Sequence, residues 1–242
     1  MKVTELLNLP GITAFSTLRD TDSPHLPYSG FSTCTYTGDD PAHCKACRNE
    51  LAHYLGISAD NIVFPRQTHS LNVAVVIDPA APLQDTDALV TDRSGIALGI
   101  HTADCVPVVL ADPKAGIIGA AHSGWRGAAG NIAALTVQKM QSLGANPADI
   151  HAAMGPCICQ ECFEVGEEVA ARFERFGAVI RTPGKPHVDL PKAVATSLVE
   201  AGVPQQNIAM PCGCSRCDFQ RFFSARRLGV QSGRTLTLII LR

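Results

Sequence analysis

A dense run of apolar segments fills the middle of the chain and most constrains the fold that it can adopt. The segments are short and are separated by polar residues, glycines and prolines, which is typical of strands. We expect strands at 61–64, 71–77, 86–91, 96–103, 106–111 and 117–121. A further segment, 235–241, is almost wholly apolar, so we expect it inside a sheet where both of its faces are covered.

Segments outside this run carry helix signals. Asp40 can cap a helix over 41–55, Pro41 fits its first turn, and Gly56 can close it. Other helices are predicted from about residue 127 to 143, over 165–176, and from a cap at Asp189 to residue 200. Strands clustered in the middle with helices around them favour the α+β class, a layered α/β sandwich with mixed sheets. No linker or internal repeat interrupts residues 1–242, so we expect a single domain.

The composition argues against several classes of protein. The chain has 242 residues, 46% of them hydrophobic, which is enough for one well-buried core without disulfide bonds. The net charge is −2 and no cluster of basic residues exceeds a pair, so neither a nucleic acid nor an anionic membrane is an expected partner. The first residues lack the apolar core of a secretion signal. We therefore expect a cytoplasmic protein whose 10 cysteines are reduced thiols or metal ligands.

Three histidine or cysteine residues each end a short segment that follows a predicted strand. They are His69, Cys105 and His122. A lone histidine or cysteine among apolar residues is more often a core residue than a ligand. Three of them at strand ends, however, would give a divalent cation two imidazoles and one thiolate and leave a fourth position open. For zinc this arrangement is typical of a catalytic site, so the pattern favours an enzyme.

Residues near Cys105 allow more than one interpretation. If the strand extends to Cys105, His101 shares its face and could be a fourth ligand or a partner of a ligand, although a buried core histidine is the more common outcome. Asp104 would point the other way, and it either orients a ligand through a hydrogen bond or caps a turn. Asp87 is a weaker candidate for a role at the site.

Segments along most of the chain resemble the YfiH, or laccase-domain, family. The two most specific are Thr102-Ala103-Asp104-Cys105-Val106-Pro107 and Ala121-His122-Ser123-Gly124-Trp125-Arg126-Gly127. Others are Gly38-Asp39-Asp40, Arg48, Gln67-Thr68-His69, Asp87-Ala88-Leu89-Val90-Thr91, Gly155-Pro156-Cys157-Ile158, Phe163-Glu164-Val165-Gly166 and Phe222-Phe223-Ser224-Ala225-Arg226-Arg227. This chain departs from the family pattern at Ser70, where glycine is usual, and at Ala225, where tyrosine is common.

The resemblance implies a fold, a cofactor and an activity. The family was first labelled multicopper polyphenol oxidase and is now described as purine nucleoside phosphorylase. Membership would imply the YfiH-like layered fold and zinc bound by His69, Cys105 and His122, with His101 outside the family motif. It would also imply phosphorolysis of adenosine, inosine, guanosine and S-methyl-5′-thioadenosine, together with deamination of adenosine. The expected partners are then a small nucleoside and phosphate.

Both reactions place demands on the residues around the metal. Deamination suits an open zinc position, because zinc lowers the pKa of bound water to about 7. Phosphorolysis needs an anion held beside the sugar, which arginine forks or backbone amides provide. Candidates for binding substrate or phosphate are Arg66, Arg126 and Ser123, the last in a turn that leads toward a helix N-terminus. The expected catalytic residues are Cys105, His122, Asp104 and Arg226.

The residues also allow three other functions. One is copper-dependent polyphenol oxidation, since two histidines and one cysteine also make a blue-copper site. A multicopper oxidase needs a further copper cluster served by many histidines, whereas this chain has 8 and no His-x-His pair. The second is a cysteine hydrolase with Cys105 as nucleophile and His122 as base. The third is a scaffold or binding protein with a closed, structural zinc site.

Two cysteine triads share one spacing, and the family resemblance does not explain this repeated pattern. They are Cys157-x-Cys159-x-x-Cys162 and Cys212-x-Cys214-x-x-Cys217. Cysteines at such short intervals hold zinc or an iron–sulfur cluster in other proteins. One hypothesis is therefore that the triads converge on a second, structural metal. The alternatives are ordinary core packing or, under oxidising conditions, disulfide bonds.

Overall fold

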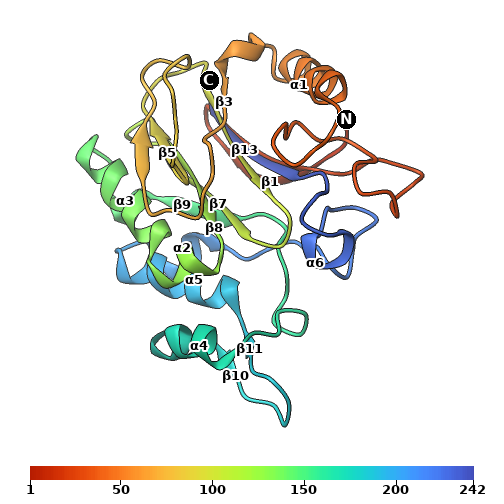
Figure 1. The fold of residues 1–242 in the computed structure, drawn as a ribbon. Helices are drawn as coiled ribbons and strands as arrows, with labels where there is room; N and C mark the ends of the chain where they lie inside the picture. Colours follow the sequence, from red (N-terminus) through yellow and green to blue (C-terminus); the bar gives the residue numbers. More distant parts are fainter.

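Two mixed β-sheets lie face to face at the centre of the protein, and helices cover their outer faces (Figure 1). The computed structural model describes residues 1–242. The α+β class with layered, mixed sheets is thus confirmed. No helix is both long enough and apolar enough to cross a lipid bilayer.

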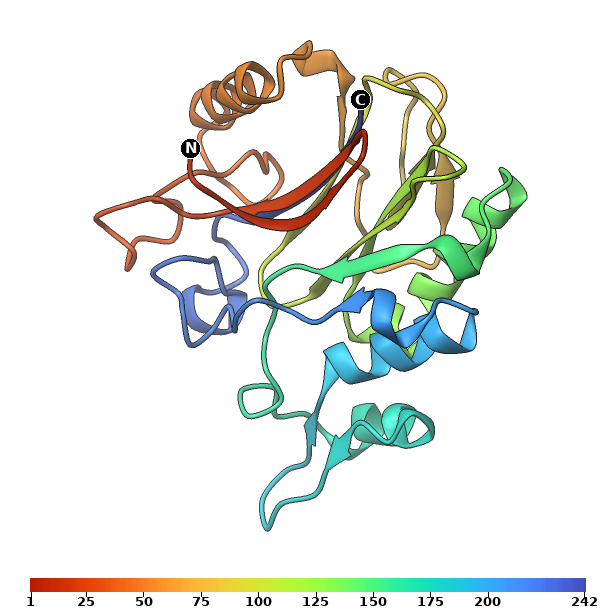
Figure 2. The same cartoon turned by 180° about the vertical axis from the view of Figure 1, so that it is seen from behind.

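The five-stranded sheet has the order β1, β2, β13, β6, β3. Its strands are β1 (Val3–Leu9), β2 (Ile12–Thr17), β13 (Thr235–Leu241), β6 (Ala97–Thr102) and β3 (Ile62–Val63). β13 pairs antiparallel with β2 on one side and with β6 on the other. The apolar segment 235–241 therefore lies inside a sheet, as its composition predicts. The β1–β2 hairpin, which the sequence did not reveal, forms the edge of this sheet (red in Figure 2).

The six-stranded sheet has the order β12, β9, β7, β8, β5, β4. Its strands are β12 (Ile208–Ala209), β9 (His151–Met154), β7 (Val106–Asp112), β8 (Ile117–Ser123), β5 (Ala88–Thr91) and β4 (Val73–Val75). The strands predicted at 106–111 and 117–121 form β7 and β8, whereas β9 and β12 are not predicted. A separate two-stranded sheet joins β10 (Val179–Ile180) to β11 (His187–Val188).

Helices pack on both outer faces. The α-helices are α1 (Pro41–Leu55), α2 (Trp125–Ala129), α3 (Ile132–Ser142), α4 (Glu167–Ala170), α5 (Leu190–Glu200) and α6 (Ala225–Leu228). Short 3₁₀ helices are η1 (Ala59–Asn61), η2 (Pro147–Asp149), η3 (Ala171–Phe176) and η4 (Gln205–Asn207). α1 begins and ends at the predicted residues: Asp40 accepts a hydrogen bond from the Ala42 amide, and Gly56 adopts the left-handed conformation that closes the helix.

Side-chain alternation along the central strands divides the core into layers. On β7, Val108 and Leu110 pack toward the helices, whereas Val109 faces the other sheet. On β6, Ile100 faces the six-stranded sheet and Ala97 faces α1. Each central strand is thus buried on both faces. This explains why the strands appear in the sequence as nearly continuous apolar runs.

Two of the predicted helices are broken. The segment 127–143 forms α2 and α3, which are separated by Gly130 and Asn131, and Asn131 has a left-handed backbone with φ of 63°. The segment 165–176 forms α4 followed by the 3₁₀ helix η3. Several predicted strands are also shorter than expected, most clearly 71–77, of which only β4 forms.

Candidate metal centre

His69, Cys105 and His122 meet where three connections reach the same end of the six-stranded sheet. His122 lies near the end of β8, Cys105 immediately precedes β7, and His69 lies in the turn between β3 and β4. Their ligand atoms all lie within 4.8 Å of one another. His122 is buried, whereas His69 is exposed. The structure thus brings the three predicted ligands together with one side open to solvent.

Asp87, which immediately precedes β5, holds this group in place. The Nδ1 atom of His122 lies 2.7 Å from Asp87 Oδ1. The turn Thr68–Ser70 wraps around the same carboxylate: the amides of Thr68, His69 and Ser70 donate to it at 3.0, 3.1 and 2.8 Å. The exposed fraction of Asp87 is 0%. Because Nδ1 faces Asp87, the Nε2 atom of His122 is left to face the other two ligands.

The turn around Asp87 depends on backbone geometry and on Ser70. His69 has φ of 64°, a left-handed conformation that points successive amides at one oxygen pair. The Ser70 hydroxyl lies 3.0 Å from Asp87 Oδ2, so a residue that departs from the family pattern adds a donor. Burial alone would raise the pKa of Asp87. The hydrogen bonds from His122, Thr68 and Ser70 outweigh this and hold the pKa well below its usual range.

The protonation states of Cys105 and His122 are linked. Burial alone would lower the pKa of His122, but the charges of Cys105 and Asp87 and their hydrogen bonds raise it to about 9. Burial would likewise raise the pKa of Cys105, but the charge of His122 and hydrogen bonds with both histidines lower it to about 6. Without a metal, both pKa shifts favour a thiolate beside an imidazolium.

Gly124 makes room for the ligands. A Cβ atom at this position would lie 3.0 Å from Cys105 Sγ and 2.9 Å from Cδ2 of His69. Any larger residue would therefore push the thiol and the imidazole away from their present positions. The lack of space beside Cys105 and His69 thus explains why the Ala121–Gly127 motif has glycine at position 124.

A cavity of about 360 Å³ opens beside His69. Its lining includes Trp125 and Arg126 from α2 and Arg172 from η3. The guanidinium of Arg126 lies 4.3 Å from the centre of the Trp125 ring, and that of Arg172 lies 6.0 Å from it. Two positive charges and an apolar ring thus flank the open side of the metal centre.

The other predicted anion-binding residues lie elsewhere. Arg66 packs on the ring of Tyr36 and lines a second cavity, of about 370 Å³, that His101 also lines. Ser123 is fully buried and its hydroxyl has no hydrogen-bond partner. Arg226, which was expected to be catalytic, directs its guanidinium to the Glu164 carbonyl oxygen at 3.3 Å. Of the predicted substrate-binding residues, only Arg126 reaches the cavity beside His69.

The sequence allowed His101 and Asp104 either a role at the site or a structural role, and the structure gives both residues structural contacts. β6 ends at Thr102, and His101 lies 3% exposed on the face toward α1, where its Nε2 is 2.8 Å from the hydroxyl of Thr33. Asp104 accepts hydrogen bonds from the Ser215 hydroxyl and the Arg226 amide, both at 2.7 Å. Asp104 therefore joins loops and the start of α6 rather than contacting a histidine ligand.

Sequence reasoning missed the importance of two residues. Asp87 is only a weak candidate from the sequence, because nothing local connects it to His122, 35 positions away. A signal was nevertheless present, since Asp87 begins one of the segments that resemble the family. Arg172 carries no such signal, because only the packing of η3 against α2 brings it to Trp125.

Comparisons with known proteins place the chain in a family. The family described as multi-copper polyphenol oxidoreductase laccase matches residues 13–242. Adenosine deaminase RL5, from an unknown prokaryotic organism, is 48% identical, and the match covers 95% of this chain and 94% of that protein. A purine nucleoside phosphorylase of Deinococcus radiodurans is 43% identical, with 88% of this chain and 83% of that protein covered.

Solved structures show the same fold. YlmD from Geobacillus stearothermophilus superposes with a TM-score of 0.90 at 29% identity and covers 100% of this chain and 98% of its own. YfiH from Bacillus licheniformis has a TM-score of 0.89 at 31% identity, with 96% and 93% covered. The match of the family model over nearly the whole chain, together with these relatives, shows that the protein belongs to the multi-copper polyphenol oxidoreductase laccase family.

Proposed function

We propose that the protein is a zinc-dependent purine nucleoside phosphorylase that also deaminates adenosine. The observation that carries the proposal is the open group of two imidazoles and one thiol beside a cavity with two arginines. The names of the similar enzymes, adenosine deaminase RL5 and several purine nucleoside phosphorylases, support the same pair of reactions. Adenosine, inosine, guanosine and S-methyl-5′-thioadenosine are the proposed substrates.

The donor set fits zinc. Two nitrogens and one sulfur within 4.8 Å of one another match the three protein ligands of a catalytic zinc site. The fixed orientation of His122 by a carboxylate is a common companion of such sites. A zinc ion held there would supply Lewis acidity and keep one coordination position open.

The surrounding residues bind and orient the reactants. Arg126 and Arg172 would hold the phosphate through charge-assisted hydrogen bonds, and Trp125 adds apolar surface for the nucleoside. Asp87 keeps the Nδ1 proton of His122 and so maintains the orientation of that ring. Asp104, through its contacts with Ser215 and Arg226, positions the turn that carries Cys105.

The test is product analysis with adenosine in the presence and absence of phosphate, on protein of measured metal content. Adenine that forms only with phosphate supports phosphorolysis, and inosine supports deamination. His69→Ala and Cys105→Ala should abolish both products and remove zinc from this site. If the protein with a full complement of zinc yields neither product, the proposal is wrong.

Arginine variants separate the two reactions. Arg126→Gln should raise the KM for phosphate by about 10- to 100-fold, as expected for loss of a charge-assisted hydrogen bond, and should leave the deamination rate less affected. Arg93→Gln is the matched control, because Arg93 is exposed and pairs with Asp92 away from the cavity. An equal loss in both reactions would assign Arg126 to nucleoside binding instead.

One observation favours a second candidate, a cysteine hydrolase. Cys105 interacts with His122, and His122 in turn is hydrogen-bonded to Asp87. This is the arrangement of a nucleophile, a base and the carboxylate that orients the base. Retention of an activity by metal-stripped wild type, with its loss on alkylation of Cys105, would favour this function. In the proposed enzyme, stripping zinc alone abolishes turnover and zinc restores it.

Copper-dependent polyphenol oxidation has less support in the structure. Only one group of donors contains two histidines, namely His69 and His122 with Cys105. A multicopper oxidase needs a further cluster ligated by several histidines. Phenol oxidation with stoichiometric copper in protein purified without added metal would reverse this preference.

A further inference from the structure

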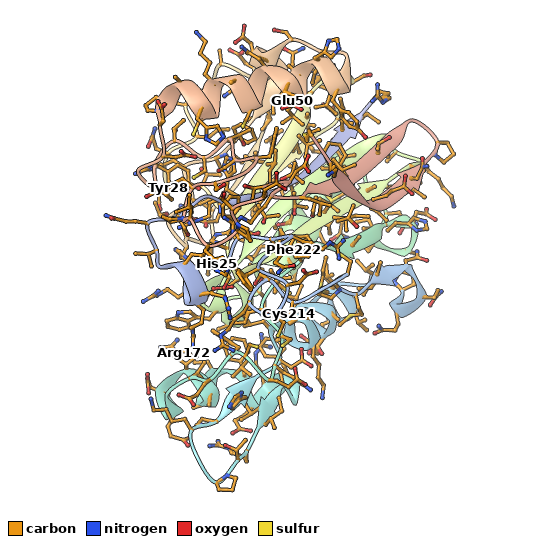
Figure 3. The ribbon with its side chains drawn as sticks, turned by 90° about the vertical axis from the view of Figure 1, so that its right-hand side faces the viewer. His25, Tyr28, Glu50, Arg172, Cys214 and Phe222 are labelled. Atoms are coloured by element: carbon orange, nitrogen blue, oxygen red, sulfur yellow. The ribbon has the colours of Figure 1, made fainter.

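A second group of metal-binding side chains lies outside the centre described above. The sulfur atoms of Cys159, Cys162, Cys214 and Cys217 all lie within 4.8 Å of one another. They come from two loops, the one after β9 and the one before α6. Cys214 and Phe222 mark the second of these loops in Figure 3. None of these sulfurs is joined in a disulfide.

The spacing of the four sulfurs fits one ion. A tetrahedron with Zn–S bonds of about 2.3 Å has S···S edges of about 3.8 Å. Cys162 Sγ and Cys217 Sγ are 3.4 Å apart, close to that edge. An iron–sulfur cluster places its own iron and sulfide atoms between the cysteines and so needs wider separations. The compact group therefore favours a single tetrahedral ion.

Backbone pairing aligns the two loops. The Ser215 amide donates to the Cys157 carbonyl at 2.9 Å, and the Cys157 amide donates to Gly213 at 3.3 Å. This bridge sets the two Cys-x-x-Cys pairs side by side, so that Cys159 faces Cys214 and Cys162 faces Cys217, each 55 positions apart. Because both pairs have the same separation in the sequence, the first cysteine of one Cys-x-x-Cys pair faces the first of the other, and the second faces the second.

Donors that stabilise thiolates are also present. The Cys159 amide donates to Cys214 Sγ at 3.3 Å. The guanidinium of Arg216 donates to Cys162 Sγ at 3.4 Å. Four thiolates around Zn²⁺ carry a net charge of 2−, so a neighbouring arginine and an N–H···S bond reduce the cost of assembling that charge.

We propose that Cys159, Cys162, Cys214 and Cys217 bind a structural Zn²⁺ ion with closed, four-sulfur coordination. Thiol protons leave to solvent as Zn–S bonds form, and no electron transfer takes place. Four protein ligands leave no position for substrate, in contrast to the centre at His69, Cys105 and His122.

The proposal specifies which cysteines of the two converging triads are the ligands. Cys157 is 2% exposed and packs in the core beneath the helices. Cys212 is exposed and lies outside the group of close sulfurs. Each triad thus contributes only its Cys-x-x-Cys half.

The site also has a structural consequence for the first centre. Ser215, next to Cys214, donates its hydroxyl to Asp104, and the Ile158 amide donates to the Asp104 carbonyl at 2.9 Å. Asp104 precedes the ligand Cys105 and has φ of 89°. Zinc between the loops would therefore brace the residue that carries the turn at Cys105.

The test is the zinc content of four proteins expressed with ample zinc and purified under reducing conditions. Wild type should hold two zinc ions per chain, His69→Ala one, and Cys159→Ser/Cys217→Ser one. Cys212→Ser is the matched control, because it removes a thiol from the same loop, and it should hold as much zinc as wild type. A different result is expected if the centre at His69, Cys105 and His122 does not bind zinc. Wild type and His69→Ala then hold one zinc ion each and the double variant holds none, which still supports the four-cysteine site.

A second readout avoids dependence on a variant that folds poorly. Cobalt-substituted His69→Ala should show the strong visible bands and intense thiolate charge-transfer absorption of tetrahedral four-sulfur coordination. Removing that metal from the folded protein should lower Tm by about 10 °C, because the metal joins two loops only in the folded state. The proposal is overturned if the double variant retains wild-type zinc, if Cys212→Ser loses as much zinc, if iron replaces zinc, or if these cysteines are disulfides in freshly reduced-purified protein.

Discussion

Asp87 sets the geometry of the candidate metal centre without being one of its proposed ligands. Its carboxylate receives hydrogen bonds from the amides of Thr68, His69 and Ser70 and from the ring of His122. One buried side chain thus fixes the position of one ligand through its ring and of another through its backbone. The consequence is that the charge of Asp87, and not only its shape, is required.

If His69, Cys105 and His122 bind zinc as proposed, Asp87→Asn should weaken that binding by about 10- to 100-fold, the usual effect of losing such a partner. The reason is that the NH₂ group of asparagine is a donor, and it would face backbone N–H groups whose hydrogen bonds the carboxylate now accepts. The measurement is zinc affinity by competition with a chromogenic chelator. Asp85→Asn is the control, since Asp85 contacts Asn72 and Thr68 but not His122. Equal losses in the two variants would contradict this role for Asp87.

His101 contributes to acid sensitivity. Burial is the main reason that its pKa falls from 6.5 to about 3. Between those values the unfolded chain binds a proton that the folded protein excludes, so the free energy of unfolding decreases as the pH falls through this range. Each proton bound only by the unfolded chain changes the free energy of unfolding by about 1.4 kcal/mol per pH unit.

Denaturant unfolding at pH values between about 5.5 and 4.5 tests this. His101→Gln should lose less stability per pH unit than wild type, by up to about 1.4 kcal/mol. Thr33→Val keeps the histidine but removes its hydroxyl partner, and it should retain the wild-type dependence on pH. The same slope in His101→Gln and wild type would show that other groups account for the acid sensitivity.

At this scale the sequence predicted what depends on local pattern. His69 and Cys105 follow β3 and β6, which are parallel neighbours in the five-stranded sheet, and His122 lies near the end of β8 in the sheet that faces it. The environment of Asp87 was not predictable from pattern, because it requires the turn Thr68–Ser70 to fold back over the start of β5. The location of Arg172 likewise depends on packing between segments remote in sequence.

Local sequence signals also decided which elements could be predicted. α1 and α5 have side-chain caps at Asp40 and Asp189, and both match their predicted bounds. The hairpin of β1 and β2 was missed because β1 is only partly buried and contains an irregularity between Glu5 and Leu7, which obscures the alternation. The break between α2 and α3 was missed because asparagine is an ordinary residue inside a helix-like pattern.

Asn131 offers a test of that break. Its left-handed backbone favours glycine or asparagine, whereas a Cβ-bearing alanine is strained there by about 1 kcal/mol. Asn131→Gly should therefore be more stable to denaturant than Asn131→Ala by about that amount. Both variants lose the contact between Asn131 and Arg175, so their difference reports the backbone alone. Greater stability of the alanine variant would mean that α2 and α3 can join.

On the scale of the whole molecule, Arg19 joins segments from both halves of the chain. Its side chain is fully buried and donates to the carbonyls of Pro24, Leu26 and Ser29 and to that of Phe219, 200 positions away. Its guanidinium also lies 4.4 Å from the centre of the Phe223 ring. No carboxylate pairs with it, and burial lowers its pKa to about 10.

Arg19→Lys should lower Tm by about 6–12 °C, because an ammonium cannot reach all four carbonyls and some would be buried without a donor. Differential scanning calorimetry of the zinc-loaded protein gives this value. Arg93→Lys, at an exposed position, is the control and should change Tm by no more than about 2 °C. A similar small change at Arg19 would mean that water replaces the lost donors.

The central position of β13 has a consequence for how the chain folds. Ser16 on β2 and Thr237 on β13 are joined by a hydrogen bond of 2.7 Å across 221 positions. Contacts between such remote segments slow folding, because a long loop must close before they form. Until β13 inserts, the inner edges of β2 and β6 are unpaired and offer templates for association with other chains. Refolding should therefore be slow, and its yield should fall as protein concentration rises.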